Sequence, residues 1–215
     1  MKAAVIVAHP DDETLWCGGT ILLHSEYEWT IIALTRKSDP DRCPKFYRIL
    51  EMLHVDCAIG DLDDGPEQFP LSEKVIDETI LNLLADRNYG IIITHSPFGE
   101  YTCHRRHEET AQSVIRLIGS GILVTRKLWL FAYTDSEKRH LPRAITSADE
   151  VINLPNDIWE KKYQIITELY GFETNSFEAK TTPKVEAFWS VRTDKPELLD
   201  INKIKEMIVE SSGDV

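Results

Sequence analysis

The sequence predicts an α/β fold, with a mostly parallel β-sheet covered by helices on both faces, in one domain over residues 1–215. The first observation is a set of continuous apolar runs, which are typical of strands that are buried on both faces. These runs lie at residues 3–8, 30–34, 90–94 and 128–132. The second observation is that stretches with helical periodicity alternate with the runs, as in successive βαβ units.

The helices expected along the chain each carry one apolar stripe. Residues 46–55, 72–87 and 106–119 have apolar side chains spaced three or four positions apart. Residues 157–171 begin with an acidic turn and end near a glycine, which predicts a further helix. Residues 185–191 alternate apolar and polar side chains, which is typical of a strand at the edge of a sheet.

The charge balance excludes some classes of partner. The chain has 24 Lys and Arg against 36 Asp and Glu, a formal net charge of −12 at pH 7. This excess repels the phosphates of nucleic acids and of anionic membranes. The apolar run at residues 3–8 is too short for a secretory signal, and no run reaches the length of a membrane span. We therefore expect a cytoplasmic protein that binds neither nucleic acid nor membranes.

Imidazole and acidic side chains follow directly after the first expected strand, in the sequence His9-Pro10-Asp11-Asp12-Glu13. Loops at the carboxyl ends of parallel strands border the ligand crevice of an open α/β sheet. Adjacent carboxylates repel one another, and a divalent cation relieves that repulsion. His9 and Asp12 can supply two of the three protein ligands that catalytic zinc commonly takes.

A second cluster supplies candidates for the third ligand. His104 and His107 follow the strand at residues 90–94, and in a helix their spacing places them on one face, toward the core. Each cluster alone is also typical of an ordinary turn or of helix-start hydrogen bonding. Because each follows a separate buried strand at the end where ligand sites gather, together they predict a metal centre.

The same motifs resemble those of a known family. Residues 8–13 with Gly18-Gly19-Thr20, and residues 94–101 leading into His104-x-x-His107, are similar to the LmbE-like or PIG-L family of zinc-dependent N-deacetylases. The resemblance implies a Rossmann-like three-layer sandwich and a homo-oligomer. It also implies a small-molecule substrate, an N-acetylated amino sugar or sugar conjugate, from whose nitrogen an acetyl or similar acyl group is removed.

The resemblance further implies a role for each residue of the motifs. His9, Asp12 and His107 would hold zinc or another divalent metal, Asp11 would be the general base, and His104 would assist the oxyanion or the leaving amine. The physical chemistry agrees with this division. Zinc lowers the pKa of its bound water toward about 7, and an adjacent free carboxylate can accept the proton.

Two departures from the family pattern bear on the site. Many members have Pro-Asp between the two histidines, and that Asp can orient the first one. Here Arg105-Arg106 stands in its place, and arginine accepts no hydrogen bond, so a different acceptor is needed to orient His104. The second departure is Thr35-Arg36-Lys37, where the family often has a glycine, in a loop that is expected to face the substrate.

Five side chains are candidates for contact with the substrate. Arg36 and Arg42 follow the second strand and can donate to sugar hydroxyls or to an anionic group. Asp64 follows a later strand, and Tyr101, like Trp16, can offer an apolar wall to a sugar face. Arginines in loops are also common as solvated surface residues, and aromatic residues are common in cores. Weaker parts of the resemblance are Asp64-Gly65, Trp159-x-x-Lys162 and Glu186-Ala187-Phe188.

Other functions stay open as alternatives. Asp11, Asp12 and Glu13 could give a glycoside hydrolase its pair of carboxylates, although this leaves His107 unexplained. A nucleotide-binding module would need a glycine-rich phosphate loop, and the sequence has none of the usual forms. A degenerate family member that binds metal without turnover is a further alternative, because the arginines before His107 replace an orienting carboxylate.

Overall fold

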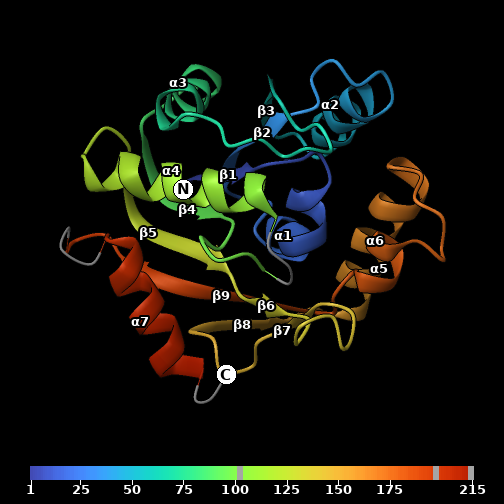
Figure 1. Ribbon diagram of the computed structural model, residues 1–215. Coiled ribbons are helices and arrows are strands. Elements are labelled where there is room, and N and C mark those ends of the chain that lie inside the picture. The colour runs from blue at the N-terminus through green and yellow to red at the C-terminus, as the bar shows by residue number, and fades with distance from the viewer. Residues whose placement is uncertain (101–103, 196–198, 213–215) are drawn as a thin grey trace.

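The computed structural model describes residues 1–100, 104–195 and 199–212, and it has three layers (Figure 1). Within these residues the central sheet has seven strands in the order β3-β2-β1-β4-β5-β9-β8. β1 pairs in parallel with β2 and β4, and the β2–β3 and β4–β5 pairs are also parallel, which confirms the expected fold class. The strands are β1 (Lys2–Val7), β2 (Glu28–Thr35), β3 (Asp56–Leu62), β4 (Asn88–Thr94), β5 (Val124–Phe131), β8 (Glu150–Asn153) and β9 (Val185–Arg192).

Helices pack on both faces of this sheet. One apolar core contains residues of α1, α2 and the π-helical turn η1, and the other contains residues of α3, α4 and α7. Two short strands, β6 (Tyr133–Thr134) and β7 (Arg143–Ala144), pair separately. The helices are α1 (Asp12–Leu23), α2 (Arg42–Met52), α3 (Glu73–Leu83), α4 (Arg105–Gly119), α5 (Asn156–Gln164), η1 (Ile165–Leu169), α6 (Phe177–Thr181) and α7 (Ile201–Ser212).

β1 shows why the expected strands are apolar throughout. Ala3, Val5 and Val7 face the core that contains α1 and α2, whereas Ala4 and Ile6 face the core that contains α3 and α4. Successive side chains of a strand point to opposite faces, so a strand between two helical layers needs an apolar residue at every position.

The expectation that residues 185–191 form an edge strand is wrong. β9 lies between β5 and β8 and pairs antiparallel with both. The edge strand next to β9 is β8, whose four residues, Glu150–Asn153, were not recognised as a strand in the sequence. The polar side of the β9 alternation does not face solvent either, because Glu186 is fully buried.

Glu186 stabilises an interruption in α1. The helix is broken at Cys17, whose φ is −141° and ψ is 16°. Glu186 accepts hydrogen bonds from the backbone N–H groups of Gly19 and Thr20, each at 2.7 Å, and pairs with Lys162 Nζ at 2.6 Å. A Cβ on Gly19 would lie 2.9 Å from Glu186 Oε1 and 2.4 Å from the Leu154 methyl groups, so glycine allows the carboxylate to approach this closely. Lys162 and Glu186, which belong to the weaker parts of the family resemblance, thus stabilise the helix that begins at Asp12.

Helix boundaries differ from the expected ones at several ends. α2 begins at Arg42, four residues early, because Asp39 Oδ1 accepts a hydrogen bond from the Arg42 backbone N–H at 2.9 Å. α3 ends at Leu83 rather than at 87, and the helix expected at residues 157–171 divides into α5 and η1. In the described part of the chain, no helix combines the length and the apolar character that crossing a membrane requires.

Candidate metal centre

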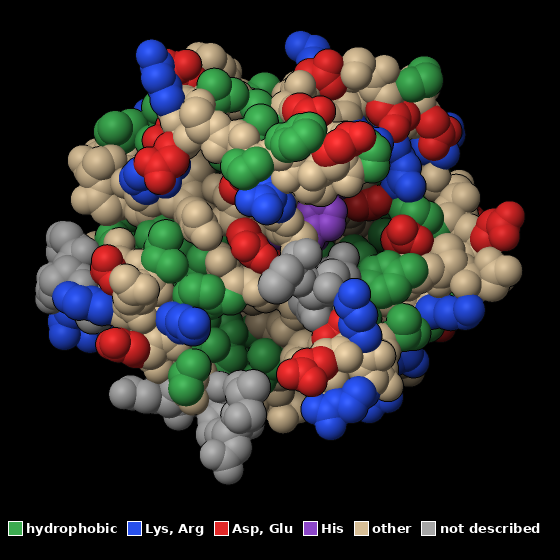
Figure 2. Space-filling model, viewed as in Figure 1, with side chains coloured by type: hydrophobic (Ala, Val, Ile, Leu, Met, Phe, Trp, Pro, Cys, Tyr) green, Lys and Arg blue, Asp and Glu red, His purple; other side chains and the backbone are tan. Residues whose placement is uncertain are grey.

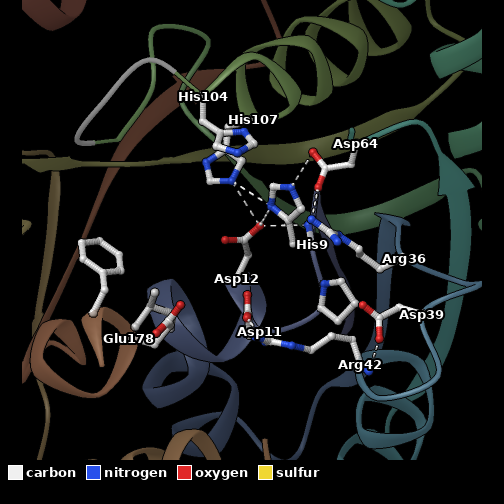
Figure 3. Close-up of a pocket in the computed structure, with 13 residues that line it drawn as sticks. His9, Asp11, Asp12, Arg36, Asp39, Arg42, Asp64, His104, His107 and Glu178 are labelled. Carbon is white, nitrogen blue, oxygen red and sulfur yellow. Dashed lines mark hydrogen bonds and ion pairs between the residues drawn. The ribbon is translucent and has the colours of Figure 1, made fainter. Parts of the chain in front are cut away.

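A pocket of about 350 Å³ lies beyond the carboxyl ends of the parallel strands. Its lining comes from the loops that follow β1, β2, β3 and β4, from the first turns of α1, α2 and α4, and from α6. In the space-filling view, histidine surface lies in a depression next to acidic side chains (Figure 2). The side chains that line the pocket are drawn in Figure 3.

Three donor atoms from distant parts of the chain converge in this pocket (Figure 3). His9 Nδ1 lies 3.0 Å from Asp12 Oδ2 and 3.1 Å from His107 Nε2, and the Asp12 and His107 atoms are 3.4 Å apart. Ligand atoms about 2.1 Å from a tetrahedral zinc ion lie roughly 3.4 Å from one another. The structure therefore brings residues 9, 12 and 107 together at a spacing that suits one shared ion.

The turn after β1 holds His9 and Asp12 in place. Asp12 Oδ2 accepts a hydrogen bond from the His9 backbone N–H at 2.9 Å, and Asp12 Oδ1 accepts one from Trp16 Nε1 at 3.2 Å. Trp16 is fully buried and does not line the pocket. It therefore orients Asp12 from the core, which agrees with the core alternative for Trp16 and not with a wall for a sugar.

Glu100 holds His107 and His95 together. Its Oε2 lies 2.8 Å from His107 Nδ1, and its Oε1 lies 2.7 Å from His95 Nδ1. His95 Nε2 accepts a hydrogen bond from the Ala8 backbone N–H at 2.9 Å, so the proton of His95 is on Nδ1, where Glu100 accepts it. Burial lowers the pKa of His95, consistent with a neutral ring. Both residues lie in the motif at residues 94–101, but the sequence analysis assigned a role to neither of them.

The electrostatics of the cluster favour a cation. Burial works against the charged form of Asp12, but the imidazoles of His107 and His9 lower the pKa of its carboxyl well below its usual range. Burial likewise works against a charged His107, but the carboxylates of Asp12 and Glu100 raise its pKa to about 10. Positive charge is thus stabilised where the carboxylates meet, and a divalent cation on the same atoms would be stabilised by the same interactions.

Two other sets of side chains could also hold a metal, because within each set the donor atoms all lie within 4.8 Å of one another. One set is His9, His104 and His107, and the other is Asp12, His95 and His107. His95 is less suited to a metal because both of its ring nitrogens already have partners. His107 belongs to both of these sets and also to the set with His9 and Asp12. The imidazole nitrogens of His9 and His107 and the carboxylate oxygen of Asp12 are donors that fit zinc or a similar divalent metal.

Asp11 has an unusual backbone conformation. Its φ is 112°, a region that residues other than glycine rarely adopt. The Asp11 backbone N–H donates to Glu13 Oε2 at 2.9 Å, and Glu13 is itself fully buried and accepts from Tyr170 Oη at 2.7 Å. This strained turn directs the Asp11 carboxylate into the pocket beside Asp12 (Figure 3). Backbone strain of this kind clusters at functional sites.

The charge on Asp11 is balanced between opposing neighbours. Burial and the nearby Asp12 carboxylate raise the pKa of Asp11 well above its usual range, and Arg42 works against that rise. Arg42 Nη1 lies 2.5 Å from Asp11 Oδ2, and its guanidinium carbon lies 4.1 Å from the centre of the Phe172 ring. Asp11 is therefore a carboxyl group whose proton affinity depends on its surroundings.

His104 lies outside α4, so it does not share a helical face with His107. It has extended backbone angles and is the residue immediately before α4, yet its ring centre still lies 4.5 Å from that of His107 and 4.8 Å from that of His9. Burial, with the neighbouring imidazoles, lowers the pKa of His104 to about 4. Its Nδ1 is buried and has no hydrogen-bond partner among the described residues. The different acceptor that the sequence required for His104 is thus not found in that part of the chain.

The expected substrate-binding side chains have different surroundings. Arg36 and Arg42 both line the pocket, but each is paired with a carboxylate, Arg36 Nη2 with Asp64 Oδ2 at 2.6 Å and Arg42 with Asp11. Asp64 also lines the pocket, and its Oδ1 lies 3.3 Å from His9 Nε2. Tyr101 lies outside the described residues.

Further residues line the pocket that were not named as site residues from the sequence. They are Pro10 and Leu15 beside the first motif, Asp39 after β2, and Phe177 and Glu178 on α6. Glu178 lies across the pocket from the histidines (Figure 3). The signal that could reveal Asp39 is its place in the same loop as Arg36 and Arg42. α6 lies late in the chain in a short helix without a motif, so the sequence offers no comparable signal for its two residues.

The family comparison agrees with the motifs. A family model described as PIG-L, GlcNAc-PI de-N-acetylase, matches residues 4–118. The uncharacterized protein L374 of Acanthamoeba polyphaga mimivirus is 28% identical over 120 residues, which is 48% of this chain and 52% of that protein. The matched region therefore spans about half the length of that relative.

Solved structures share the fold over most of the chain. The N,N'-diacetylchitobiose deacetylase of Pyrococcus horikoshii superposes with a TM-score of 0.67 at 16% identity, covering 89% of this chain and 84% of that one. A zinc-inhibited form of the teicoplanin deacetylase Orf2 gives 0.58 at 15% identity, covering 91% and 100%.

A third structure shows that the fold does not decide the activity. The 4-carboxy-2-hydroxymuconate hydratase GalB of Pseudomonas putida KT2440 has a TM-score of 0.62 at 15% identity, covering 89% of this chain and 96% of that one. Because a hydratase and deacetylases share this architecture, the activity of the present chain has to be argued from its site.

Proposed function

This chain belongs to the GlcNAc-PI de-N-acetylase (PIG-L) family, and on that basis we propose that it is a zinc-dependent N-deacetylase of an N-acetylated amino sugar or sugar conjugate. The observation that carries the proposal is the convergence of His9 Nδ1, Asp12 Oδ2 and His107 Nε2, with no pair more than 3.4 Å apart. Three protein ligands leave a fourth tetrahedral position for water or substrate.

Asp11 is the proposed general base. When bound, zinc lowers the pKa of water and polarises the amide carbonyl. The Asp11 carboxylate lines the same pocket, and burial with Asp12 raises its pKa, which suits a group that must accept a proton near neutral pH. Arg42 holds this carboxylate in position from the rim of the pocket. The proton that Asp11 accepts from water is then available for the departing amine.

His104 is the proposed stabiliser of the oxyanion. Its lowered pKa, about 4, keeps the ring neutral at neutral pH. A neutral imidazole can donate one N–H to the carbonyl oxygen as negative charge develops there. It has no proton to spare for the leaving nitrogen, so that role falls to Asp11.

The pocket supports a small substrate. Its volume of about 350 Å³ is at the lower end of the range for small-molecule sites and suits one sugar ring with its acetamido group. Arg36, Asp39 and Arg42 offer donors and acceptors for hydroxyl groups at the rim. We propose N-acetylglucosamine or a conjugate of it as the substrate class.

Two of the alternative functions have less support. The glycoside hydrolase would use paired carboxylates, but Glu13 is directed into the core and is bonded to Thr14 and Tyr170. The nucleotide-binding module would use free backbone N–H groups near the glycines, but those of Gly19 and Thr20 donate to Glu186.

The test is the release of free amine from a panel of N-acetylated sugars, measured before and after chelation together with the zinc content. Asp11→Asn should retain about one zinc per chain and lose roughly 100-fold or more in kcat. The matched control, Asp56→Asn at the exposed start of β3, should resemble the wild type. His107→Ala should lose both metal and activity.

Three outcomes would contradict the proposal. Near wild-type hydrolysis by Asp11→Asn would show that Asp11 is not the general base. Activity that survives a strong chelator would show that the reaction does not need the metal. Stoichiometric zinc without amine release from any substrate would favour the degenerate metal-binding alternative.

A further inference from the structure

We propose that Arg106 and Glu109 are positioning residues that act through Asp64 to orient His9 toward the metal. The inference rests on the proposed metal centre and concerns how this chain supports it. Arg106 stands immediately before His107, where the sequence departs from the family pattern. The structure shows what this arginine contacts in place of the histidines.

Arg106 binds the loop that follows β3. Its side chain is 2% exposed, its Nε donates to the Asp63 carbonyl at 2.5 Å, and its Nη2 donates to the Phe69 carbonyl at 2.8 Å. A guanidinium has several N–H donors in a fixed plane, so it can bind two backbone carbonyls of one loop at once. Both ends of the segment from 63 to 69 are thereby attached to α4.

Glu109 completes this attachment. Its Oε2 accepts from Arg106 Nη1 at 2.5 Å, and its Oε1 accepts from the Leu71 backbone N–H at 3.1 Å. The arginine therefore has a counterion, and the end of the loop gains a third hydrogen bond to α4. A buried guanidinium needs such a partner to be tolerated.

The attached loop carries Asp64, which contacts His9. The Asp64 side chain is 6% exposed, and its Oδ1 lies 3.3 Å from His9 Nε2 while Gln68 Nε2 donates to the same oxygen at 2.9 Å. The opposite nitrogen of His9, Nδ1, is the one near Asp12 and His107. A carboxylate on the outer nitrogen of a ligand histidine places the proton there and leaves the other lone pair for the metal.

This arrangement changes which histidine is oriented. The Asp that can orient the first histidine of the pair in many family members is absent, and His104 Nδ1 has no partner among the described residues. Arg106, which replaces that Asp, instead binds the loop between β3 and α3 and so supports Asp64, whose carboxylate contacts His9. The substitution thus moves the supporting interaction from His104 to a proposed metal ligand.

The experiment is a double-mutant cycle on zinc affinity. The zinc dissociation constant is measured by competition with a chromophoric chelator for the full chain, Arg106→Gln, Asp64→Ala and the double variant. Loss of a supporting carboxylate weakens metal binding about 10- to 100-fold, so each single variant should bind zinc more weakly by about that factor. The double variant should be no weaker than Asp64→Ala alone, because Arg106 acts through Asp64.

The matched control is Arg116→Gln. Arg116 lies on the same helix and bonds Asp77 across to α3, with Nη2 at 2.7 Å from Asp77 Oδ1, but it does not line the pocket. Its loss should lower the melting temperature and leave the zinc dissociation constant unchanged. If Arg106→Gln does not fold, Arg106→Lys replaces it in the same cycle, because lysine keeps the charge but cannot bind both carbonyls.

Unchanged zinc affinity in the Arg106 variant would overturn the positioning role and leave the proposed function standing. If the two losses of zinc affinity multiply in the double variant, the positioning role would also be overturned, because Arg106 and Asp64 would then act independently. Failure of the wild-type chain to bind zinc would overturn the proposed metal centre and this inference with it.

Discussion

The Glu100 carboxylate lies 2.8 Å from His107 Nδ1, the ring nitrogen opposite the one that approaches Asp12. The same carboxylate accepts from the His95 ring and from the Ser96 backbone N–H at 3.0 Å. One buried acid therefore fixes the orientation of a proposed metal ligand and of its neighbour. Its pKa is lowered because these donors outweigh its burial.

Glu100→Gln should weaken both zinc binding and folding. A glutamine has one acceptor oxygen and one donor group, so one of the histidine N–H groups would face an amide N–H. We expect zinc affinity to fall about 10- to 100-fold and the free energy of unfolding to fall by about 1–3 kcal/mol. Chelator competition and urea unfolding measure the two effects. Glu160→Gln, at an exposed position of α5, is the control, and equal behaviour of the two variants would refute the role of Glu100.

Lys162→Met should destabilise the protein strongly. It leaves Glu186 buried without its cation, and breaking a buried ion pair in this way costs about 3–5 kcal/mol. Urea unfolding measures the change. The control is Lys161→Met, because the neighbouring lysine is exposed and its loss should change stability by less than about 0.5 kcal/mol. Equal stability of the two variants would show that the pair does not stabilise the interruption in α1.

His104 should make the metal-free protein less stable as the pH falls from 6.5 toward 4. Its pKa is about 4 in the folded chain, against an ordinary value of 6.5 once the chain unfolds, so the unfolded chain binds more protons between these values. His104 therefore opposes folding increasingly as the pH falls through this window. Melting temperatures of the wild type and His104→Asn, measured in chelator, should differ progressively across it. A constant difference from pH 7 to pH 4 would contradict a half-buried histidine that stays neutral in the folded chain.

The pocket should discriminate against anionic substrates. Both of its arginines are already paired with carboxylates, and Asp39 and Glu178 add further negative charge. Glu178→Lys should therefore raise kcat/KM for N-acetylglucosamine 6-phosphate relative to N-acetylglucosamine, by about 3- to 10-fold for charges exposed at a rim. Glu160→Lys, outside the pocket, should leave the ratio unchanged. The same ratio in the wild type and Glu178→Lys would place the substrate's phosphate away from α6.

The sheet and the convergence of the two histidine-containing clusters could be predicted because both follow from local patterns. Buried parallel strands are apolar at every position, as in β1, and their carboxyl ends meet, so the clusters after β1 and β4 could be expected to lie together. The choice of His107 over His104 as a metal ligand came from the family resemblance and stays a prediction. The edge strand β8 could not be predicted, because an edge needs no apolar run. The alternation in β9 is misleading because Glu186 is neutralised by a lysine 24 positions away.

The supporting residues were harder to identify for a different reason. Glu100 and Arg106 act through contacts that depend on loop conformation, and a charged residue near a histidine has no preferred spacing in the sequence. From the sequence, Arg106 shows only that the hydrogen-bond acceptor many family members have at this position is missing. Its contacts with the Asp63 and Phe69 carbonyls are visible only in the fold. The pattern around positions 36 and 42 suggests free donors, and the structure pairs both arginines with acids.

We propose that His9, Asp12 and His107 share one divalent ion, which an anomalous difference map at the zinc edge, from crystals of the zinc-loaded protein, would locate. We expect one strong peak about 2.0–2.2 Å from His9 Nδ1, Asp12 Oδ2 and His107 Nε2. A peak bound by His95, or no peak among these three side chains, would contradict it.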